Sequence, residues 1–323
     1  MKDAFLETKG LKKYFGTPRG QLHAVDDVSL RICYGQTTGV VGESGCGKST
    51  LGRTMIHLLE STGGQILYEG KDITHVSRRE LKQLRREMQI IFQDPFASLD
   101  PRYTVEDTIR EPLTLLGTLS RSRINDEIDR LMHLVGIDER LRNAYPHELD
   151  GGRRQRVVIA RALAPKPRFI ICDEPVSALD VSIQAQVLNL LQDLQKGMGL
   201  TYLFITHDLS VVKHISNEIC VMYLGQLIEY APSEELFAHP LHPYTKALLS
   251  AIPSTDIHHR PERILLKGEI TSPIEPRPGC RFAARCPYVS DRCRQNQQLE
   301  EVSPGHSAAC CRIHEISQTT VSS

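Results

Sequence analysis

The sequence has no tryptophan, no excess of charge of either sign and no long apolar run. Lysine and arginine together number 39, as do aspartate and glutamate, so the formal net charge of the 323-residue chain is zero. This balance argues against a nucleic-acid partner, and the basic run SRRELKQLRREM (77–88) is more typical of a solvated helix face. No apolar run approaches the roughly 18 residues that span a bilayer, and the first ten residues lack the apolar core of a signal peptide. We therefore expect a cytoplasmic protein, which could still dock on a membrane protein.

The nine cysteines are distributed unevenly. Four are scattered over the first 279 residues in mostly apolar, strand-like surroundings and are expected to be buried or loop thiols: Cys33, Cys46, Cys172 and Cys220. Five crowd into the tail: Cys280, Cys286, Cys293, Cys310 and Cys311. Because disulfides are rare in the cytosol, the tail cluster favours a metal site. Its spacings match neither the short zinc pattern nor the ferredoxin runs, so zinc, an iron–sulfur cluster and no metal all stay open.

A phosphate-binding loop is indicated by VGESGCGKST (41–50), which fits G-x-x-x-x-G-K-[ST] from Gly42 to Ser49. The loop follows an apolar strand pattern, TTGVV, and precedes a helical one, LGRTMIHLLE, as such loops require. Its glycines let backbone N–H groups turn toward a polyphosphate, while Lys48 is placed for the β- and γ-phosphates and Ser49 for Mg²⁺. The residues predicted to bind the nucleotide are Gly42, Glu43, Ser44, Gly45, Cys46, Gly47, Lys48, Ser49 and Thr50.

Acids follow a second apolar strand pattern, RFIICDEP (168–175). Asp173 at the strand's end is suited to hold Mg²⁺, and Glu174 to orient and deprotonate a water aimed at the γ-phosphate. Two further polar residues follow strand patterns, Gln93 after MQIIF (88–92) and His207 after LTYLFIT (200–206). Their shared position at strand ends favours function: Gln93 could touch both metal and attacking water, and His207 the γ-phosphate. The paired acids predict hydrolysis of the nucleotide.

Together these segments resemble the ATPase subunits of ABC transporters over nearly the whole chain. VGESGCGKST resembles the Walker A motif, IIFQDP the Q-loop, FIICDEP Walker B, SALD with Asp180 the D-loop, and ITHD the switch histidine. Tyr14 in LKKYF resembles the aromatic that stacks on adenine, with a packed strand tyrosine as the alternative. HELDGGRRQRVVIARAL (147–163) occupies the signature position. The resemblance implies a head-to-tail dimer, in which this signature loop closes on the ATP held by a partner subunit.

The signature departs from the family's usual LSGGQ, because it reads LDGGR from Leu149 to Arg153. Asp150 is as good a helix N-cap as serine, but its carboxylate cannot donate to a γ-phosphate and repels it. Arg153, three residues on, could hold that carboxylate or bind phosphate itself. Either the pair Asp150 and Arg153, with Gly151 and Gly152 between them, makes a compensated signature, or the partner's ATP site is weakened.

A narrower resemblance is to the ATPase subunits of di- and oligopeptide importers, also used for nickel. It rests on DPFASLDPRYTV (94–105), LDVSIQAQVLNLL (179–191), LHPYTKALLSAIP (241–253) and the tail PGCRFAARCP (278–287), and it is greatest to the second ATPase subunit of such systems. This implies a paralogous ATPase partner, two membrane permease subunits and an extracytoplasmic binding protein, at the cytoplasmic face of the inner membrane. It also implies a [4Fe–4S] cluster on Cys280, Cys286, Cys293 and Cys310. If the metal is zinc instead, His306 and His314 are rival ligands, and Cys311 could replace its neighbour.

The expected fold is α/β: a P-loop NTPase with a mostly parallel core sheet, an antiparallel β subdomain and a helical arm at about 95–160. Strands are predicted near 168–173, 201–206 and 219–223. Residues 1–253 are assigned to the ATPase domain and 254–323 to a C-terminal extension with the cysteines. Two other functions stay open. A catalytically silent nucleotide-binding partner is disfavoured by Glu174 and His207, and a soluble ABC ATPase outside transport by the single cassette without a long coiled-coil insertion.

Overall fold

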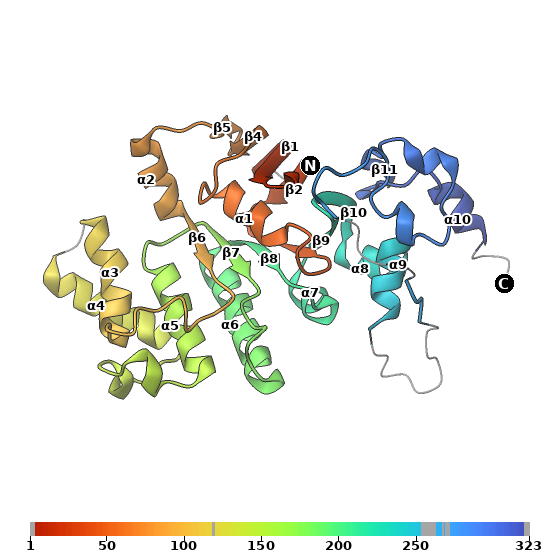
Figure 1. Cartoon of the computed structure of the whole chain (residues 1–323). Helices are drawn as coiled ribbons and strands as arrows, with labels where there is room; N and C mark the ends of the chain where they lie inside the picture. Colours follow the sequence, from red (N-terminus) through yellow and green to blue (C-terminus); the bar gives the residue numbers. More distant parts are fainter. Residues whose placement is uncertain (1–3, 118–119, 253–262, 267, 269–271, 320–323) are drawn as a thin grey trace. The chain divides into compact units, whose positions relative to one another are not determined.

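The computed structural model describes residues 4–117, 120–252, 263–266, 268 and 272–319 (Figure 1). These residues divide into two compact units, one made of residues 33–36 and 76–205, the other of 4–32, 37–75 and the chain from 206 onward. The domain boundary expected at residue 253 falls outside the described residues and stays a prediction. Within the described ranges, no helix is both long and apolar enough to cross a membrane.

The first unit contains three parallel strands in the order β6-β7-β8: β6 (Met88–Ile91), β7 (Phe169–Asp173) and β8 (Thr201–Ile205). Every residue of β7 and β8 is buried, as is typical of parallel strands covered on both faces. Ile91 pairs with Cys172, so β6 and β7 end side by side. The strands predicted at 88–92, 168–173 and 201–206 are confirmed within a residue or two.

Helices make up the rest of this unit: α2 (Arg78–Glu87), α3 (Val105–Leu116), α4 (Arg121–Leu134), α5 (Gly151–Leu163) and α6 (Val181–Met198). Capping boxes start α2 at Ser77 and α3 at Thr104, where each side chain accepts from the backbone N–H three residues on. Helices α3, α4 and α5 pack against one another (Figure 1), so the predicted helical arm is confirmed. Most of the basic run 77–88 forms α2, in which Leu84 is the single buried residue, in keeping with a solvated face.

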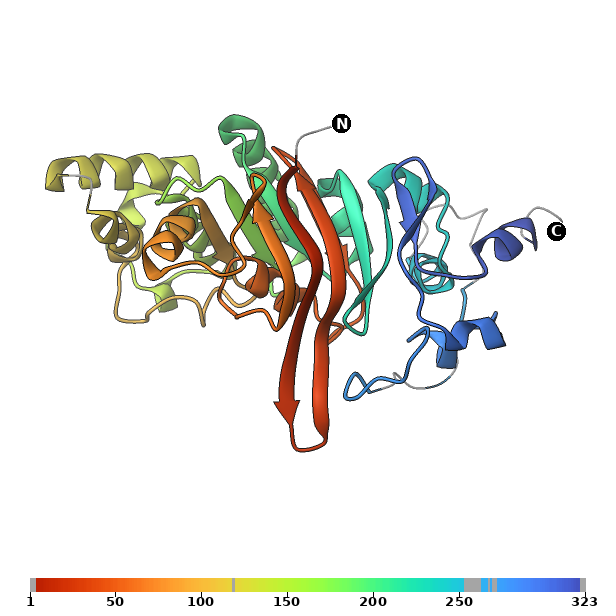
Figure 2. The ribbon, with the colours of Figure 1, turned by 90° about the horizontal axis from the view of Figure 1, so that it is seen from above.

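The second unit holds an antiparallel sheet in the order β2-β1-β4-β5: β1 (Ala4–Thr17), β2 (Gly20–Cys33), β4 (Gly63–Tyr68) and β5 (Lys71–Asp72). Figure 2 shows β1 and β2 running side by side as one long hairpin. This is the predicted antiparallel subdomain.

A further group of strands in the same unit has the order β11-β12-β10-β9-β3: β3 (Thr37–Val41), β9 (Glu218–Tyr223), β10 (Gln226–Pro232), β11 (Glu300–Ser303) and β12 (His306–Ala308). Strands β3 and β9 are parallel and the other pairs are antiparallel. The accompanying helices are α1 (Lys48–Met55), α7 (Leu209–Ile215), α8 (Ser233–Ala238), α9 (Pro243–Ser250) and α10 (Ile313–Thr319). The tail thus extends a sheet, which the sequence analysis did not foresee.

An aromatic cluster fixes the tail to this unit. The ring of Phe282 is 1% exposed and lies 5.4 Å, centroid to centroid, from both Tyr223 of β9 and Tyr244 of α9. Burial of one large aromatic side chain contributes a few kcal/mol to stability, and edge-to-face packing adds to it. The segment around Phe282 is therefore an integral part of the core.

A buried polar cluster lies beside this core. Glu229 of β10 is fully buried; its carboxylate accepts from the backbone N–H groups of Leu241 and His242, at 2.7 and 2.8 Å, and pairs with His306 of β12. The Nδ1 atom of His242 accepts from the backbone N–H of Tyr244 at 3.1 Å and caps α9. Burial lowers the pKa of His242 to about 4, against the opposing field of Glu229.

We expect this depressed pKa to make the native state sensitive to acid. The unfolded chain protonates His242 near pH 6.5 and the folded chain only near pH 4, so its stabilising contribution is present above pH 6.5 and is lost as pH falls toward 4. The loss between pH 7 and 5 is about 2 kcal/mol. His242→Asn keeps a capping acceptor but does not titrate, so its unfolding midpoint should fall less with pH than that of the wild type. Parallel pH curves for the two proteins would contradict the assignment.

Candidate functional site

The two ends of the loop 42–47 are tightly packed in the second unit, whereas Ser44 and Gly45 in its middle are exposed. A β-carbon on Gly42 would lie 2.2 Å from the carbonyl oxygen of Met222, and one on Gly47 1.9 Å from that of Ala24. Gly47 also has φ near 105° and caps α1, so both positions require glycine. The strand–loop–helix arrangement predicted from the sequence is confirmed.

Lys48 is directed into this loop. Its side chain is 5% exposed, and Nζ donates to the carbonyl oxygens of Gly42 at 2.8 Å and Glu43 at 3.0 Å. A buried ammonium group needs such acceptors, and the loop thereby holds a positive charge at its centre. The loop backbone is held in turn from outside, because the N–H of Glu43 donates to the hydroxyl of Tyr244 at 3.0 Å.

Tyr14 of β1 stands in a network of side chains. Its ring stacks on His23 at 3.9 Å between centroids, so a base can stack only on its other face. Its hydroxyl donates to Asp26, which also bonds His23 Nδ1 at 3.2 Å. Burial alone would raise the pKa of Asp26, but the hydrogen bonds from Tyr14 and His23 and the charge of Arg281 outweigh it and lower that pKa. Tyr14 is thus held by polar contacts as well as by the strand.

His207 lies in the second unit, just after β8. The preceding residue, Thr206, donates its N–H to the carbonyl of Val40 at 3.1 Å. Val40 lies in β3, which runs directly into the loop at Gly42. The backbone at His207 is therefore tied to the end of β3, and the side chain of His207 is exposed.

In the first unit, Gln93 and Glu174 come together where β6 and β7 end. Gln93 Nε2 donates to Glu174 Oε2 at 2.8 Å, as expected for side chains that follow adjacent parallel strands. Asp173, at the end of β7, is 1% exposed. Glu174 has φ near +49°, and its N–H donates to the carbonyl of Ile205 at 2.9 Å. Such backbone strain in a non-glycine residue is frequent at functional positions.

Asp150 is the N-cap of α5, with its carboxylate accepting from the N–H of Arg153 at 2.7 Å. The guanidinium of Arg153 also pairs with this carboxylate at 3.4 Å, with both side chains more than half exposed. The structure therefore retains the cap that serine would supply, and it contains the ion pair proposed as compensation. At this exposure the pair itself adds little stability.

The two glycines of this segment have a packing role. A β-carbon on Gly152 would lie 2.7 Å from Cγ2 of Ile183 in α6, and one on Gly151 3.0 Å from Cδ2 of Leu179. Asp180, which lies between Leu179 and Ile183 in the sequence, caps α6 by accepting from the N–H of Ile183 at 3.0 Å. The glycine pair thus lets the start of α5 approach the start of α6.

The tail cysteines gather in the second unit. Cys293 Sγ lies 3.9 Å from Cys311 Sγ, and the N–H of Cys280 donates to the carbonyl of Cys293 at 2.8 Å. Burial raises the pKa of Cys280 to about 12, with further increases from the neighbouring thiols Cys293, Cys310 and Cys286. A metal needs thiolates, and a bound cation would reverse this shift. Among the described residues no three His, Cys, Asp or Glu side chains are arranged closely enough to hold a metal ion.

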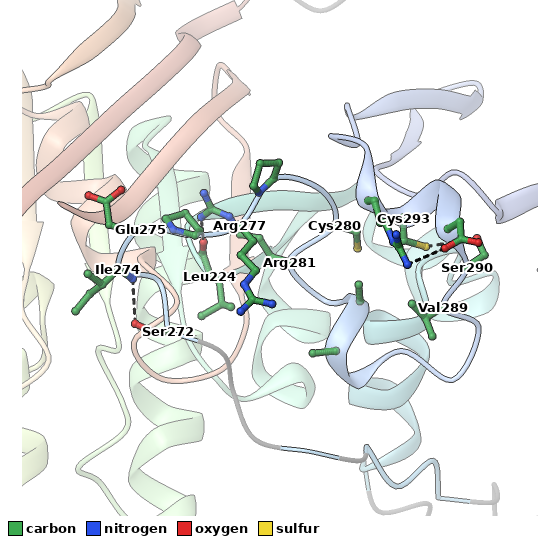
Figure 3. Close-up of a pocket in the computed structure, with 16 residues that line it drawn as sticks. Leu224, Ser272, Ile274, Glu275, Arg277, Cys280, Arg281, Val289, Ser290 and Cys293 are labelled. Atoms are coloured by element: carbon green, nitrogen blue, oxygen red, sulfur yellow. Dashed lines mark hydrogen bonds and ion pairs between the residues drawn. The ribbon is translucent and has the colours of Figure 1, made fainter. Parts of the chain in front are cut away.

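A cavity of about 1020 Å³ lies next to these cysteines. Figure 3 shows Arg281 on the side of Leu224 and Cys280 on the side of Cys293. The lining includes Arg277 and Glu275 as well, so the walls carry both charges.

Sequence reasoning missed two residues of the tail. Arg285 pairs with Glu43 of the loop at 2.8 Å, and Arg281 pairs with Asp26 beneath Tyr14. Both arginines stand in PGCRFAARCP next to cysteines, so the sequence drew attention to the segment. Nothing in the pattern indicated their partners, which lie more than 240 positions earlier.

Comparison with known proteins matches both parts of the chain. Residues 25–177 match the ABC transporter family and residues 228–293 the oligopeptide/dipeptide transporter C-terminal region. The chain is 50% identical over 308 residues to the oligopeptide transport ATP-binding protein OppF of Salmonella typhimurium, covering 94% of this chain and 92% of that one. It is 48% identical over 320 residues to AppF of Bacillus subtilis, an oligopeptide transport ATP-binding protein, covering 96% and 97%.

Two solved structures are similar in fold. One is cbiO1 from Clostridium perfringens, part of an ABC transporter complex, with a TM-score of 0.66 and 30% identity over 74% of this chain and 92% of that one. The other is a dimeric ATP-binding cassette in a post-hydrolysis state bound to ADP and Pi. Its TM-score is 0.65, with 28% identity over 71% of this chain and 98% of that one.

The tight approach of α5 to α6 gives a stability prediction. Gly152→Ala places a methyl group against Ile183 and should lower the unfolding free energy by about 1–3 kcal/mol. Gly197→Ala is the matched control, because a β-carbon there meets nothing within 4 Å and should stabilise α6 by about 0.5–1 kcal/mol. Denaturant unfolding measures both. Equal stability of the two variants would show that α5 and α6 can separate without cost.

Proposed function

Because the chain belongs to the ABC transporter ATP-binding proteins of the oligopeptide and dipeptide type, we propose that its ATP hydrolysis powers uptake of di- or oligopeptides. The peptide cargo is supported by the match of residues 228–293 to the oligopeptide/dipeptide transporter C-terminal region, and the hydrolysis by the hydrogen bond between Gln93 and Glu174 at the end of the parallel strands. It orients the carboxylate that we assign as the hydrolytic base. Nickel or a metal chelate is the alternative cargo, since binding proteins and permeases select the substrate.

We assign nucleotide binding to Tyr14 and the loop from Gly42 to Thr50. The loop is preformed, and Lys48 would exchange its two carbonyl acceptors for β- and γ-phosphate oxygens. Mg²⁺ prefers oxygen ligands, and we assign this role to the side-chain oxygens of Ser49, Gln93 and Asp173. An Mg²⁺ ion bound together with ATP would neutralise part of the phosphate charge. This assignment takes its support from the burial of Lys48 and Asp173.

Glu174 is assigned as the general base and His207 as a γ-phosphate contact. Glu174 would accept a proton from water as that water's oxygen bonds to the γ-phosphorus and the bond to the β–γ bridging oxygen breaks, releasing ADP and phosphate. Gln93 orients the carboxylate through its amide. Gln93 lies in the chain between β6 and the helical arm. Loss of the γ-phosphate would change the contact of Gln93 with Glu174, and this change could be passed on to the arm.

The assembly we propose is a head-to-tail pair with a paralogous ATPase subunit on two membrane permease subunits, served by an extracytoplasmic binding protein. The chain would then act at the cytoplasmic face of the inner membrane. Asp150, Gly151, Gly152 and Arg153 would meet the partner's ATP. The ion pair between Asp150 and Arg153 favours a compensated signature, because it offsets the carboxylate's charge.

The decisive experiment compares Glu174→Gln with Asp150→Ser in the assembled membrane complex. Glu174→Gln should reduce ATP turnover at least about a hundredfold while ATP binding persists, because the base is lost but the amide can still bond Gln93. Asp150→Ser should leave turnover unchanged or slow it, since Arg153 loses its partner.

Two outcomes would revise the assignment. If the Glu174→Gln complex hydrolyses ATP as fast as the wild type, Glu174 is not the catalytic base, and this chain is better described as a silent nucleotide-binding subunit. Faster turnover by Asp150→Ser would show that the natural carboxylate weakens the partner's site.

We also propose that Cys280, Cys286, Cys293 and Cys310 hold a metal centre, a [4Fe–4S] cluster or alternatively zinc. The crowding of five cysteines into one short segment of the sequence supports this. The ligands would have to move closer together on binding, because no three of the described His, Cys, Asp or Glu side chains are arranged closely enough to hold a metal ion. Such a centre would act as a structural or regulatory crosslink of the tail. Metal and sulfide analysis of anaerobically purified protein should find the metal in the wild type and in Cys33→Ala, a cysteine outside the cluster. Cys310→Ser should lose it. Loss from Cys311→Ser alone would move the fourth ligand to Cys311, whose sulfur lies 3.9 Å from that of Cys293.

A further inference from the structure

Arg281 connects the tail to the residues around Tyr14. Its side chain is 6% exposed; it pairs with Asp26 and donates to the carbonyl oxygen of Leu224. Asp26 in turn receives the hydroxyl of Tyr14 and bonds Nδ1 of His23. One buried guanidinium therefore holds the carboxylate that orients both stacked rings.

Arg285 connects the same tail segment to the phosphate-binding loop. Its side chain is 10% exposed, and its NH1 donates to both carboxylate oxygens of Glu43, at 2.8 and 3.1 Å. The carboxylate of Glu43 and the neighbouring Tyr223 hydroxyl raise the pKa of Arg285, so the guanidinium is always charged. Glu43 is the residue after Gly42, and its carbonyl oxygen accepts from Lys48.

Phe282, one of the three residues between the two arginines, anchors their segment in the core. Phe282 is buried against Tyr223 and Tyr244, and the hydroxyl of Tyr244 accepts the backbone N–H of Glu43. The segment is thus anchored in the core beside the loop. Charged groups fixed on a rigid, buried segment lose little freedom when they orient their partners.

We propose that Arg281 and Arg285 of the C-terminal extension are positioning residues of the nucleotide site. Arg281 acts on the base side, by fixing Asp26 and through it Tyr14. Arg285 acts on the phosphate side, by fixing Glu43 and neutralising a carboxylate within the loop to which we assign the binding of a polyanion. This inference rests on the proposed binding of ATP by Tyr14 and the loop.

The electrostatic part has a definite sign. Without Arg285, Glu43 stands beside the triphosphate as an unpaired negative charge and repels it. Removing the Glu43 carboxylate as well should therefore recover much of the lost affinity. A role limited to holding the tail in place would predict that the second substitution leaves affinity low.

The test measures competition against a fluorescent ATP analogue by the purified full-length chain, with ATP and inorganic tripolyphosphate as competitors. Arg281→Ala should weaken ATP about tenfold and leave tripolyphosphate unchanged, because only the base contact is disturbed. Arg285→Ala should weaken both about equally, and Glu43→Gln in that background should restore both. Arg281→Lys, which keeps the charge, should bind ATP more tightly than Arg281→Ala. The matched control is Arg294→Ala, an exposed arginine of the extension paired with its neighbour Asp291.

The outcomes separate this inference from the function on which it rests. If the wild type fails to bind ATP, the proposed function itself is wrong. If the wild type binds but folded Arg281→Ala and Arg285→Ala match it, the arginines do not position the site. Equal weakening of ATP and tripolyphosphate by Arg281→Ala, or no recovery with Glu43→Gln, would reduce them to structural attachments. Thermal melts of each variant establish that it is folded.

Discussion

The enclosure of the loop 42–47 is the constraint on which much of the second unit depends. Carbonyl oxygens of Ala24 and Met222 leave no space for a side chain at Gly47 and Gly42, and the N–H of Gly225 donates to the carbonyl of Cys46 at 2.7 Å. Strand β2, strand β9 and the turn after it are therefore placed by their contact with this loop. A loop whose two ends are fixed in this way keeps its backbone in place, so that only Lys48 would have to exchange its carbonyl acceptors if the loop bound a polyphosphate.

The C-terminal extension belongs to the same compact unit as the loop 42–47. It adds β12 and β11 to the strands beyond β10, inserts Phe282 into the aromatic core, and supplies Arg281 and Arg285 to acids near the loop and Tyr14. An attachment with so many buried polar pairs is costly to break, because separating one partner leaves a buried charge without compensation. A metal on the nearby cysteines would act on a segment already joined to the nucleotide site.

The signature segment combines packing and electrostatics. Position 152 requires glycine because Ile183 leaves no room for a β-carbon. Position 150 requires only a side chain that accepts a hydrogen bond at the helix N-cap. This explains how aspartate can replace serine without disturbing α5. Its charge is then met by Arg153, one turn later on the same helix. The helix start therefore tolerates the change locally.

Local patterns were sufficient to predict the strands β3, β7 and β8. They also placed the glycines and Lys48 at the loop after β3, and Asp173 and Glu174 at the end of β7. In each case the chemistry is encoded within about ten consecutive residues, because a buried parallel strand must be apolar and the residue at its end is free to be polar. The contacts of Gln93 with Glu174, of Arg281 with Asp26 and of Arg285 with Glu43 join residues 81 to 255 positions apart. The contact of Gln93 with Glu174 follows once β6 and β7 are adjacent. Only the tertiary structure decided the two arginine pairs, since the free energy of a charge pair depends on where folding places the two groups and how far it excludes water from them.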